Sequence, residues 1–315
     1  MSNFASQKKS FIMTYAIIGT GAIGGFYGGM LAHAGNEVHF LFHSDYNDAH
    51  ERGLIVKSIY GDFTINPVNA YKSSKDMPAC DVIIVGMKTV NEQMLPELIK
   101  PVLKPTSLVV LIQNGLNIEK HIAEQLPESI SVAGGMAFIC SNKIGPATIN
   151  HLDYGFLNVG LYRGSEQMLH QFCDDMNASG VKTTYAPDLK EARWKKLVWN
   201  IPYNGMTVIL DTTTECLMKN QDSRALIYDI MLEVLKAADA NGVHIPQSFA
   251  DDMMDLTDNM RPYKPSMRLD FDNHRPMEIH YIYSEAIKAA RESGISIPKI
   301  EVMEQQLKFI QSTYL

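Results

Sequence analysis

A lysine and two asparagines that recur every four residues have the clearest chemical potential in this sequence. Lys196, Asn200 and Asn204 stand at positions i, i+4 and i+8. In a helix with about 100° between successive residues they project from one face. A cation can polarise a carbonyl group, and two carboxamides can hold the other oxygens of a small substrate. The spacing therefore predicts a polar substrate-binding face on a helix.

A glycine-rich turn near the start of the chain predicts a phosphate cradle. It follows a short apolar run, precedes a helical pattern, and reads Gly19, Thr20, Gly21, Ala22, Ile23, Gly24. The first glycine permits a tight turn, the second lets a pyrophosphate approach, and the third lets the helix pack on the strand. The helix N-terminus offers free N–H groups to the anion. A glycine turn without a ligand, or a methyltransferase-type turn, is the alternative, but the strand–turn–helix context favours a dinucleotide.

The two features together predict hydride transfer across a cleft, with the nucleotide in one half and the substrate in the other. The choice between NADP and NAD is less clear. NAD-binding folds place an acidic residue at the end of the second strand, and here that strand ends in His43, Ser44 and Asp45. His43 and Ser44 could donate to a 2′-phosphate, whereas Asp45 could bind a ribose. We expect NADPH, with NAD not excluded.

The elements that must position these residues alternate in the first half of the chain. Apolar runs at 15–18, 38–42, 81–86 and 108–112 are separated by helical patterns, which indicates a parallel sheet covered on both faces. Residues 54–70 predict a meandering strand or a hairpin, and 131–140 and 148–162 predict further strands. The predicted fold class is α/β, a Rossmann-like dinucleotide-binding domain followed by a mostly α-helical domain.

The pattern becomes helical near residue 188. Asp188 with Glu191 forms a capping box that opens a helix. Residues 222–241 form a helix stopped by a glycine, Pro276 is placed as the first residue of another helix, and a last helix begins near Pro298. We therefore predict domains at 1–187 and 188–315, with residues 1–12 as a loose extension.

Composition narrows the classes of function. The 315 residues carry 35 acidic and 28 basic side chains, a net charge of −7 with no basic stripe, which argues against a nucleic-acid binder. The four cysteines are widely spaced, so we expect reduced thiols and no metal site. The sequence has no run of 18 apolar residues, so we expect no membrane span. The N-terminal residues look superficially like a signal peptide, but cleavage would remove the glycine turn. A cytoplasmic protein is expected.

The stretch from Trp194 to Asn204 resembles the W-x-K-L-x-x-N-x-x-x-N helix of the ketopantoate reductase (2-dehydropantoate 2-reductase) family. The resemblance extends from residue 13 to the C-terminal helix. It includes the sequence VGMKT at 85–89, QNG at 113–115, and Ser266 twelve residues before Glu278. These motifs together are far more specific than the glycine turn alone.

The resemblance implies a role for each matching residue. Lys196 would be the general acid that protonates the keto oxygen, and Asn200, Asn204 and Ser266 would bind the substrate. Glu278 would act near Lys196 and the nicotinamide ribose. Lys88, Asn114 and Cys140 would contact the cofactor. The implied reaction is the NADPH-dependent reduction of 2-dehydropantoate to pantoate in pantothenate biosynthesis.

Three departures from the family pattern leave alternatives open. His43 stands where NADP-dependent members usually carry arginine, Thr214 replaces a later asparagine, and Pro202 interrupts the backbone hydrogen bonds of the Lys196 helix. A related reductase of another 2-keto or 3-hydroxy acid, or a non-catalytic NADP-sensing protein, remains possible. The expected partner is a small 2-keto acid, with a possible homodimer and with neither nucleic acid nor membrane.

Overall fold

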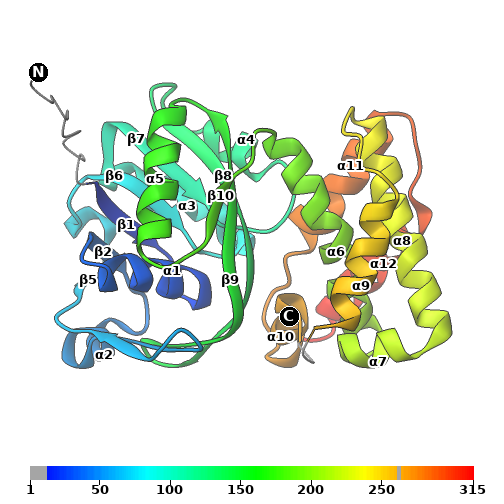
Figure 1. The fold of residues 1–315 in the computed structure, drawn as a ribbon, viewed down its shortest axis with the longest axis horizontal. Helices are drawn as coiled ribbons and strands as arrows, with labels where there is room; N and C mark the ends of the chain where they lie inside the picture. The colour runs from blue at the N-terminus through cyan, green and yellow to red at the C-terminus, as the bar shows by residue number, and fades with distance from the viewer. Residues whose placement is uncertain (1–12, 261–263) are drawn as a thin grey trace, which may run out of the picture.

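The structure is a computed structural model that describes residues 13–260 and 264–315. The predicted extension at 1–12 lies outside the described residues. A sheet flanked by helices forms one part of the molecule, and a group of helices stands beside it (Figure 1). The predicted α/β fold class is confirmed.

The sheet has ten strands, and nine of them follow the order β4-β3-β9-β8-β7-β6-β1-β2-β5, with β10 paired to β9. Only the β3–β4 and β8–β9 pairs are antiparallel among the described strands. The strands are β1 (Thr14–Ile18), β2 (Glu37–Leu41), β3 (Leu54–Ser58), β4 (Phe63–Ile65), β5 (Asn69–Tyr71), β6 (Cys80–Val85), β7 (Leu103–Leu111), β8 (Ser131–Gly145), β9 (Thr148–Arg163) and β10 (Thr183–Tyr185). The predicted hairpin at 54–70 is confirmed as β3–β4.

Helices cover both faces of this sheet, as the continuous apolar runs predict. Ile17 belongs to the apolar cluster that includes residues of α1 and α5, whereas its neighbour Ile18 belongs to the cluster that includes residues of α3 and α4. Successive strand residues point to opposite faces, so both faces must be apolar. The covering helices are α1 (Ala22–His33), α2 (Tyr46–Arg52), α3 (Leu95–Ile99), α4 (Ile118–Ala123) and α5 (Glu166–Ala178), with short 3-10 turns η1 (Ser74–Asp76), η2 (Thr89–Met94) and η3 (Lys100–Val102).

The second part is helical and has a hydrophobic core of its own, in which Trp194, Leu197 and Ile201 are fully buried. Its elements are α6 (Leu189–Ile209), α7 (Thr214–Lys219), α8 (Gln221–Ala240), α9 (Ser248–Asp258), α10 (Ser266–Asp272), a π-helical turn η4 (His280–Ser284), α11 (Glu285–Glu292) and α12 (Pro298–Ser312). The boundary at residue 187 stays a prediction.

Helix α6 begins as predicted and continues through its proline. The Asp188 carboxylate accepts a hydrogen bond from the backbone N–H of Glu191 at 2.9 Å, which caps the helix. Pro202 lies inside the helix without ending it. The residues on either side of the proline therefore stay on one continuous element.

The helix predicted to begin at Pro276 begins later. The helical turn starts at Ile279 and continues as the π-helical turn η4. Two contacts hold the preceding segment out of a helix. Met277 N–H donates to Oε1 of Gln311 at 2.7 Å, and Glu278 accepts two hydrogen bonds from Thr89. Tertiary contacts here override the helix-starting preference of proline.

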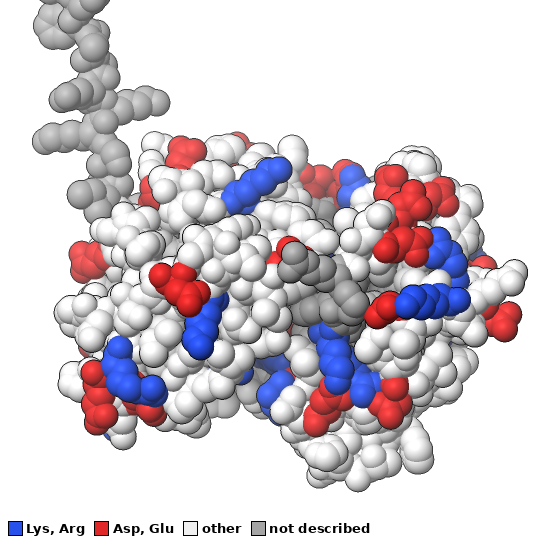
Figure 2. Space-filling view, turned by 60° about the horizontal axis from the view of Figure 1, so that its bottom comes forward, with Lys and Arg blue, Asp and Glu red and all other residues white. Residues whose placement is uncertain are grey.

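Two further observations concern the surface and the helices of the described residues. Acidic and basic side chains are intermingled on the face that Figure 2 presents. Among the described helices, none is long and apolar enough to cross a membrane.

Candidate functional site

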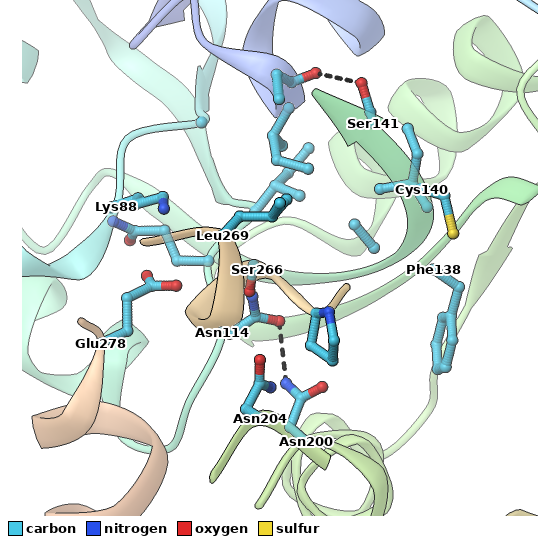
Figure 3. A pocket seen from close by; sticks show the side chains of 18 of the residues that line it. Lys88, Asn114, Phe138, Cys140, Ser141, Asn200, Asn204, Ser266, Leu269 and Glu278 are labelled. Carbon is cyan, nitrogen blue, oxygen red and sulfur yellow. Dashed lines mark hydrogen bonds between the residues drawn. The ribbon is translucent and has the colours of Figure 1, made fainter. Parts of the chain in front are cut away.

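A cavity of about 470 Å³ lies between the sheet and the helical part, and it is lined by residues of both. It brings together the following residues predicted from the sequence: Ala22, Ile23, Lys88, Asn114, Cys140, Lys196, Asn200, Asn204, Ser266 and Glu278. Figure 3 labels seven of them, Lys88, Asn114, Cys140, Asn200, Asn204, Ser266 and Glu278. Segments separated by more than 250 residues in sequence thus meet around one space.

The glycine turn stands at one end of this cavity, where Ala22 and Ile23 line it. Gly19 has φ +92°, a left-handed conformation that glycine adopts without strain. A Cβ atom on Gly24 would lie 2.3 Å from the carbonyl oxygen of Gly19, so the close approach of α1 to the turn requires glycine there. This backbone geometry agrees with the tight turn and close packing expected of these two glycines, and their part in cofactor binding stays a prediction.

Gly21 differs, because a Cβ atom there would meet no protein atom within 4 Å. It precedes α1 and caps it without a side-chain hydrogen bond. Helix N-termini leave unpaired N–H groups that favour an anion. Open space beside such a terminus fits a pyrophosphate, so these residues suit a bound dinucleotide.

The residues that follow β2 are those on which the choice between NADP and NAD depends. His43 is exposed and does not line the cavity. Asp45 is buried, and its carboxylate accepts hydrogen bonds from Ala147 N–H at 2.8 Å and Ser44 Oγ at 2.7 Å and pairs with the Lys143 ammonium. These partners lower the pKa of Asp45 although burial acts to raise it. Its oxygens are therefore engaged by protein groups rather than free for a ribose.

Lys196 is the most unusual titratable group of the site. Its ammonium lies 3.8 Å from the centre of the Phe138 ring and 6.0 Å from that of Trp199. Desolvation lowers its pKa from 10.5 to about 7, with the Cys140 thiol acting to raise it and Arg193 to lower it. A lysine with a pKa near neutrality can donate a proton at physiological pH.

The neighbouring Lys195 shows what an ordinary lysine does on the same helix. Its ammonium pairs with Glu191 at 2.5 Å, and its side chain is 39% exposed. Lys195 is therefore a partly solvated charge that is paired within its own helix.

The two asparagines of α6 face the cavity from buried positions. Asn200 Nδ2 donates to Oδ1 of Asn114 at 3.2 Å, which joins α6 to the loop that follows β7. Asn204 Oδ1 accepts a hydrogen bond from Met267 N–H at 3.2 Å, which places the start of α10 and its Ser266 beside α6. Despite Pro202, Lys196, Asn200 and Asn204 all line one cavity.

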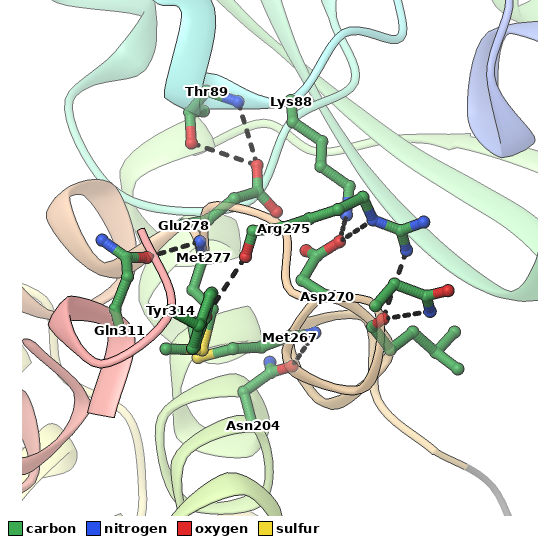
Figure 4. A network of polar contacts seen from close by, with 12 residues as sticks. Lys88, Thr89, Asn204, Met267, Asp270, Arg275, Met277, Glu278, Gln311 and Tyr314 are labelled. Carbon is green, nitrogen blue, oxygen red and sulfur yellow. Dashed lines mark hydrogen bonds and ion pairs between the residues drawn. The ribbon is translucent and has the colours of Figure 1, made fainter.

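Glu278 lines the same cavity, but its contacts are with the sheet part (Figure 4). Its carboxylate accepts hydrogen bonds from the backbone N–H and the hydroxyl of Thr89, both at 3.0 Å. Desolvation raises its pKa, while Lys88 and Thr89 act to lower it. Glu278 is not among the groups that shift the pKa of Lys196, and its carboxylate is directed toward Thr89.

Lys88 approaches the helical part instead of standing free in the cavity. It forms an ion pair with Asp270 of α10, which also pairs with Arg275 at 3.0 Å (Figure 4). Asp270 is fully buried, and its second oxygen has no hydrogen-bond partner among the described residues. The ion pair joins the two parts across the cavity.

Two other positions noted in the sequence, Cys140 and Thr214, are both buried. The Cys140 thiol is buried in the cavity wall, and burial raises its pKa to about 11, so it is a poor nucleophile at neutral pH. Thr214 is buried at the start of α7 and does not line the cavity. Within residues 13–260 and 264–315, no group of three His, Cys, Asp or Glu side chains could hold a metal ion.

Sequence reasoning missed several residues of the site. Arg193 pairs with Glu119 in a buried position, Phe138 lies against Lys196, and Asp270 holds Lys88. Arg193 and Lys196 are three residues apart on one helix, a spacing that could have indicated a shared face. The other two contacts join segments that are distant in sequence, so no local sequence pattern could have indicated them.

The fold and the cavity are those of an oxidoreductase with a Rossmann-like nucleotide-binding half. The model of "Ketopantoate reductase PanE/ApbA" matches residues 15–164, and that of the C-terminal part of the same family matches residues 188–311. The chain therefore belongs to the ketopantoate reductase family.

Individual relatives agree with this assignment. A 2-dehydropantoate 2-reductase of Nostoc sp. is 43% identical over 302 residues, covering 94% of each chain. The crystal structure of 2-dehydropantoate 2-reductase from Geobacter metallireducens has a TM-score of 0.90 at 36% identity, covering 94% of this chain and 99% of that one. A D-mandelate dehydrogenase bound to NADH and anilino(oxo)acetate has a TM-score of 0.88 at 22% identity, covering 96% and 99%, and shows the shared fold alone.

Proposed function

We propose that this protein is an NADPH-dependent reductase that converts 2-dehydropantoate to pantoate, with Lys196 as the proton donor. The observation that carries the proposal is a partly desolvated lysine in the wall of a cavity that also holds two asparagines and a serine. The substrate follows from the relatives, since the Nostoc protein named 2-dehydropantoate 2-reductase is 43% identical over nearly the whole chain.

The substrate's oxygens would be held mainly by the helical part. Asn200 and Asn204 offer carboxamides from α6, and Ser266 adds a hydroxyl from the start of α10. Hydrogen bonds from these groups would fix the carboxylate and the hydroxyl of the substrate, so that its keto oxygen lies beside the Lys196 ammonium. Holding the substrate in a reactive orientation in this way lowers the barrier of the chemical step.

Lys196 would then transfer one proton from Nζ to the keto oxygen as that oxygen gains negative charge. Its depressed pKa makes the ammonium a stronger acid than an exposed lysine, which favours the transfer near neutral pH. The positive charge would also stabilise the oxygen before the proton moves. A positioned general acid typically contributes about 10²–10⁴-fold to the rate.

The cofactor would lie along the sheet side of the cavity. The N-terminus of α1, with Ala22 and Ile23 in the lining, would bind the pyrophosphate, and Lys88 and Asn114 would contact the rest of the dinucleotide. When bound, the reduced nicotinamide would supply a hydride from C4 to the keto carbon. Asn114 is tied to Asn200, so one hydrogen bond links the cofactor side to the substrate face.

Glu278 and Cys140 complete the proposed cofactor side. The Glu278 carboxylate, fixed by Thr89, would accept a hydrogen bond from the nicotinamide ribose, and the backbone around Cys140 would make a further contact. His43 would stand near the 2′-phosphate from outside the cavity lining, which supports only a modest preference for NADPH over NADH. Use of NAD stays open.

Two alternatives use the same cavity. The lining includes Phe138, Phe156 and Leu256, and these apolar side chains favour a second candidate, a reductase of another 2-keto or 3-hydroxy acid. An NADP-sensing protein without turnover would bind the cofactor and reduce nothing. We further propose two domains that meet near residue 187, a cytoplasmic location in pantothenate biosynthesis, and a possible homodimer. A ketopantoate reductase from Staphylococcus aureus at 21% identity is described as dimeric.

The decisive experiment measures oxidation of NADPH and of NADH by the purified protein with 2-dehydropantoate as acceptor. A panel of other 2-keto acids serves as the comparison. We expect the highest kcat/KM with NADPH and 2-dehydropantoate. A higher kcat/KM with another keto acid would identify that acid as the substrate. Tight NADPH binding without turnover on any acid would favour a non-catalytic NADP-sensing protein.

A further inference from the structure

The ammonium of Lys196 lies over an aromatic ring rather than beside a carboxylate. Its Nζ atom is 3.8 Å from the centre of the Phe138 ring, well within the roughly 6 Å at which a cation is attracted to the negative face of an aromatic ring. Trp199, three residues on in α6, is at 6.0 Å, the edge of that range. Phe138 therefore makes the closer contact.

The Phe138 ring packs against a second aromatic ring. Phe138 on β8 is paired with Phe156 on β9 in the antiparallel ladder, and their rings stack with centres 4.7 Å apart and planes 13° from parallel. Phe156 in turn meets the Tyr154 ring edge-on at 6.3 Å. Aromatic pairs in such arrangements restrain one another, so the ring presented to Lys196 has a defined orientation.

Within the described residues, the side chain of Lys196 has no hydrogen bond and no ion pair. The titratable groups that act on it are the Cys140 thiol from β8 and the Arg193 guanidinium from α6, and Tyr154 of β9 is also in the cavity wall. Among the described residues that line the cavity, Glu278 is the only one with a carboxylate, and it is bound to Thr89. The ring face of Phe138 thus lies against an ammonium that has no carboxylate beside it among the described residues.

We propose that Phe138 is a positioning residue for Lys196: its ring, held by Phe156, fixes the ammonium at the cavity wall and stabilises its positive charge in place of a carboxylate. This inference rests on the proposed role of Lys196 as proton donor. An aromatic ring suits that role, because it attracts the cation without accepting its proton. A carboxylate at the same position would hold the charge more strongly and raise the pKa of the acid.

Removal of the Phe138 ring should therefore lower the pKa of Lys196. Without the attraction, the charged form loses stabilisation while desolvation remains, so the pKa of Lys196 should fall. A cation–π contact at a partly desolvated site corresponds to a change of about one in pKa. The protonated fraction at neutral pH, and with it the proton-donating activity, should decrease.

The experiment follows Lys196 directly by NMR of protein labelled with ¹³C at the lysine ε-carbon. The resonance is assigned by its loss in Lys196→Arg, and its pH titration is compared in the wild type, Phe138→Leu and Phe138→Tyr. We expect the pKa to fall by about one in Phe138→Leu and to return close to the wild-type value in Phe138→Tyr, which restores a ring. Phe138→Met provides a second ring-free variant if the leucine variant folds poorly.

The neighbouring lysine on α6, Lys195, provides a matched control. Lys195 lies over the Phe249 ring at 5.6 Å, so Phe249→Leu removes a ring from a neighbouring lysine and should leave the titration of Lys196 unchanged. The high-pH limb of kcat/KM with 2-dehydropantoate should move to lower pH in Phe138→Leu and Phe138→Met only.

The NMR and kinetic readouts separate two kinds of failure. An unchanged pKa of Lys196 in both ring-free variants would overturn the positioning role, whatever the enzyme reduces. A fall in that pKa without turnover on any keto acid would support the geometry and reject the proposed function instead.

Discussion

Arg193 on α6 and Glu119 on α4 form an ion pair in which the side chains are only 2% and 4% exposed. Arg193 Nε donates to Glu119 Oε1 at 3.0 Å, and Nη1 donates to the carbonyl oxygen of Gln113 at 2.5 Å. The pair joins the helical part to the sheet part three residues before Lys196. It therefore fixes the start of α6, which carries the proposed substrate face, against the sheet part, which carries the proposed cofactor side.

Glu119→Ala should destabilise the protein strongly, because it leaves the Arg193 charge buried without its partner. Breaking a buried pair in this way typically costs about 3–5 kcal/mol. Urea denaturation followed by circular dichroism measures the loss. Glu215→Ala removes the partner of the exposed Lys219 and should change the free energy of unfolding little. Equal effects of the two variants would contradict the importance assigned to the buried pair.

The fold could be predicted from the sequence because its signals are local. The strand runs, the glycine turn and the capping box at Asp188 each depend on neighbouring residues, and the structure has all three. The family pattern also selected ten residues that line one cavity. The start of the helix after Pro276 was misplaced, because contacts of Met277 and Glu278 with distant residues decide it.

The contacts that complete the site could not be predicted in the same way. Lys88 and Asp270 are 182 residues apart, and Arg193 and Glu119 are 74 apart. Such pairs depend on how α6 and α10 pack against the sheet, which no local pattern encodes. The ring beneath Lys196 likewise comes from another element. Sequence reasoning identified the polar residues of the site but not the residues that hold them.

Gly21→Val should weaken cofactor binding while the fold remains intact. A Cβ atom at Gly21 meets no protein atom within 4 Å, so the added side chain would occupy only the space proposed for the pyrophosphate. Titration of NADPH by nicotinamide fluorescence measures the affinity, and the melting temperature checks the fold. Gly145→Val is a matched control outside the cavity lining, where a Cβ atom also has room. Unchanged NADPH affinity in Gly21→Val would count against the proposed cradle.

His43→Arg should increase the preference for NADPH. His43 is exposed just after β2 and the nearby Asp45 is engaged by Lys143 and Ala147, so we expect neither residue to select strongly between the cofactors. An arginine would add a fixed positive charge and a bidentate donor for a 2′-phosphate. The ratio of kcat/KM for NADPH to that for NADH should exceed one in the wild type and rise in the variant. A wild-type preference for NADH would refute this expectation.

Lys196→Met should stabilise the protein at neutral and acidic pH. The pKa of Lys196 is lowered from 10.5 to about 7, so the unfolded chain binds more protons than the folded one between these values. Wild-type stability therefore rises with pH across this window. The gain from Lys196→Met should be largest below pH 7 and disappear toward pH 10.5. Melting temperatures of both proteins at pH 6 and above pH 9 test the sign, and Lys195→Met should show no such trend.

The last prediction separates the two adjacent lysines by activity. Lys196→Ala removes the proposed proton donor and should lower kcat by at least about a hundredfold, which corresponds to about 3 kcal/mol at 1.36 kcal/mol per decade. NADPH affinity should change little, because the proposed cradle lies at the start of α1. Lys195→Ala should change kcat little, since that side chain pairs with Glu191 and projects about 100° away from Lys196 around the helix axis.

Steady-state kinetics of the two variants, measured side by side with NADPH titrations, decide between the lysines. A loss of activity confined to Lys196→Ala would support proton donation by this residue and the substrate face that it shares with Asn200 and Asn204. The reverse result, with Lys195→Ala inactive and Lys196→Ala active, would show that the helix presents a different face to the substrate. The roles proposed for both asparagines would then fail together with that of Lys196.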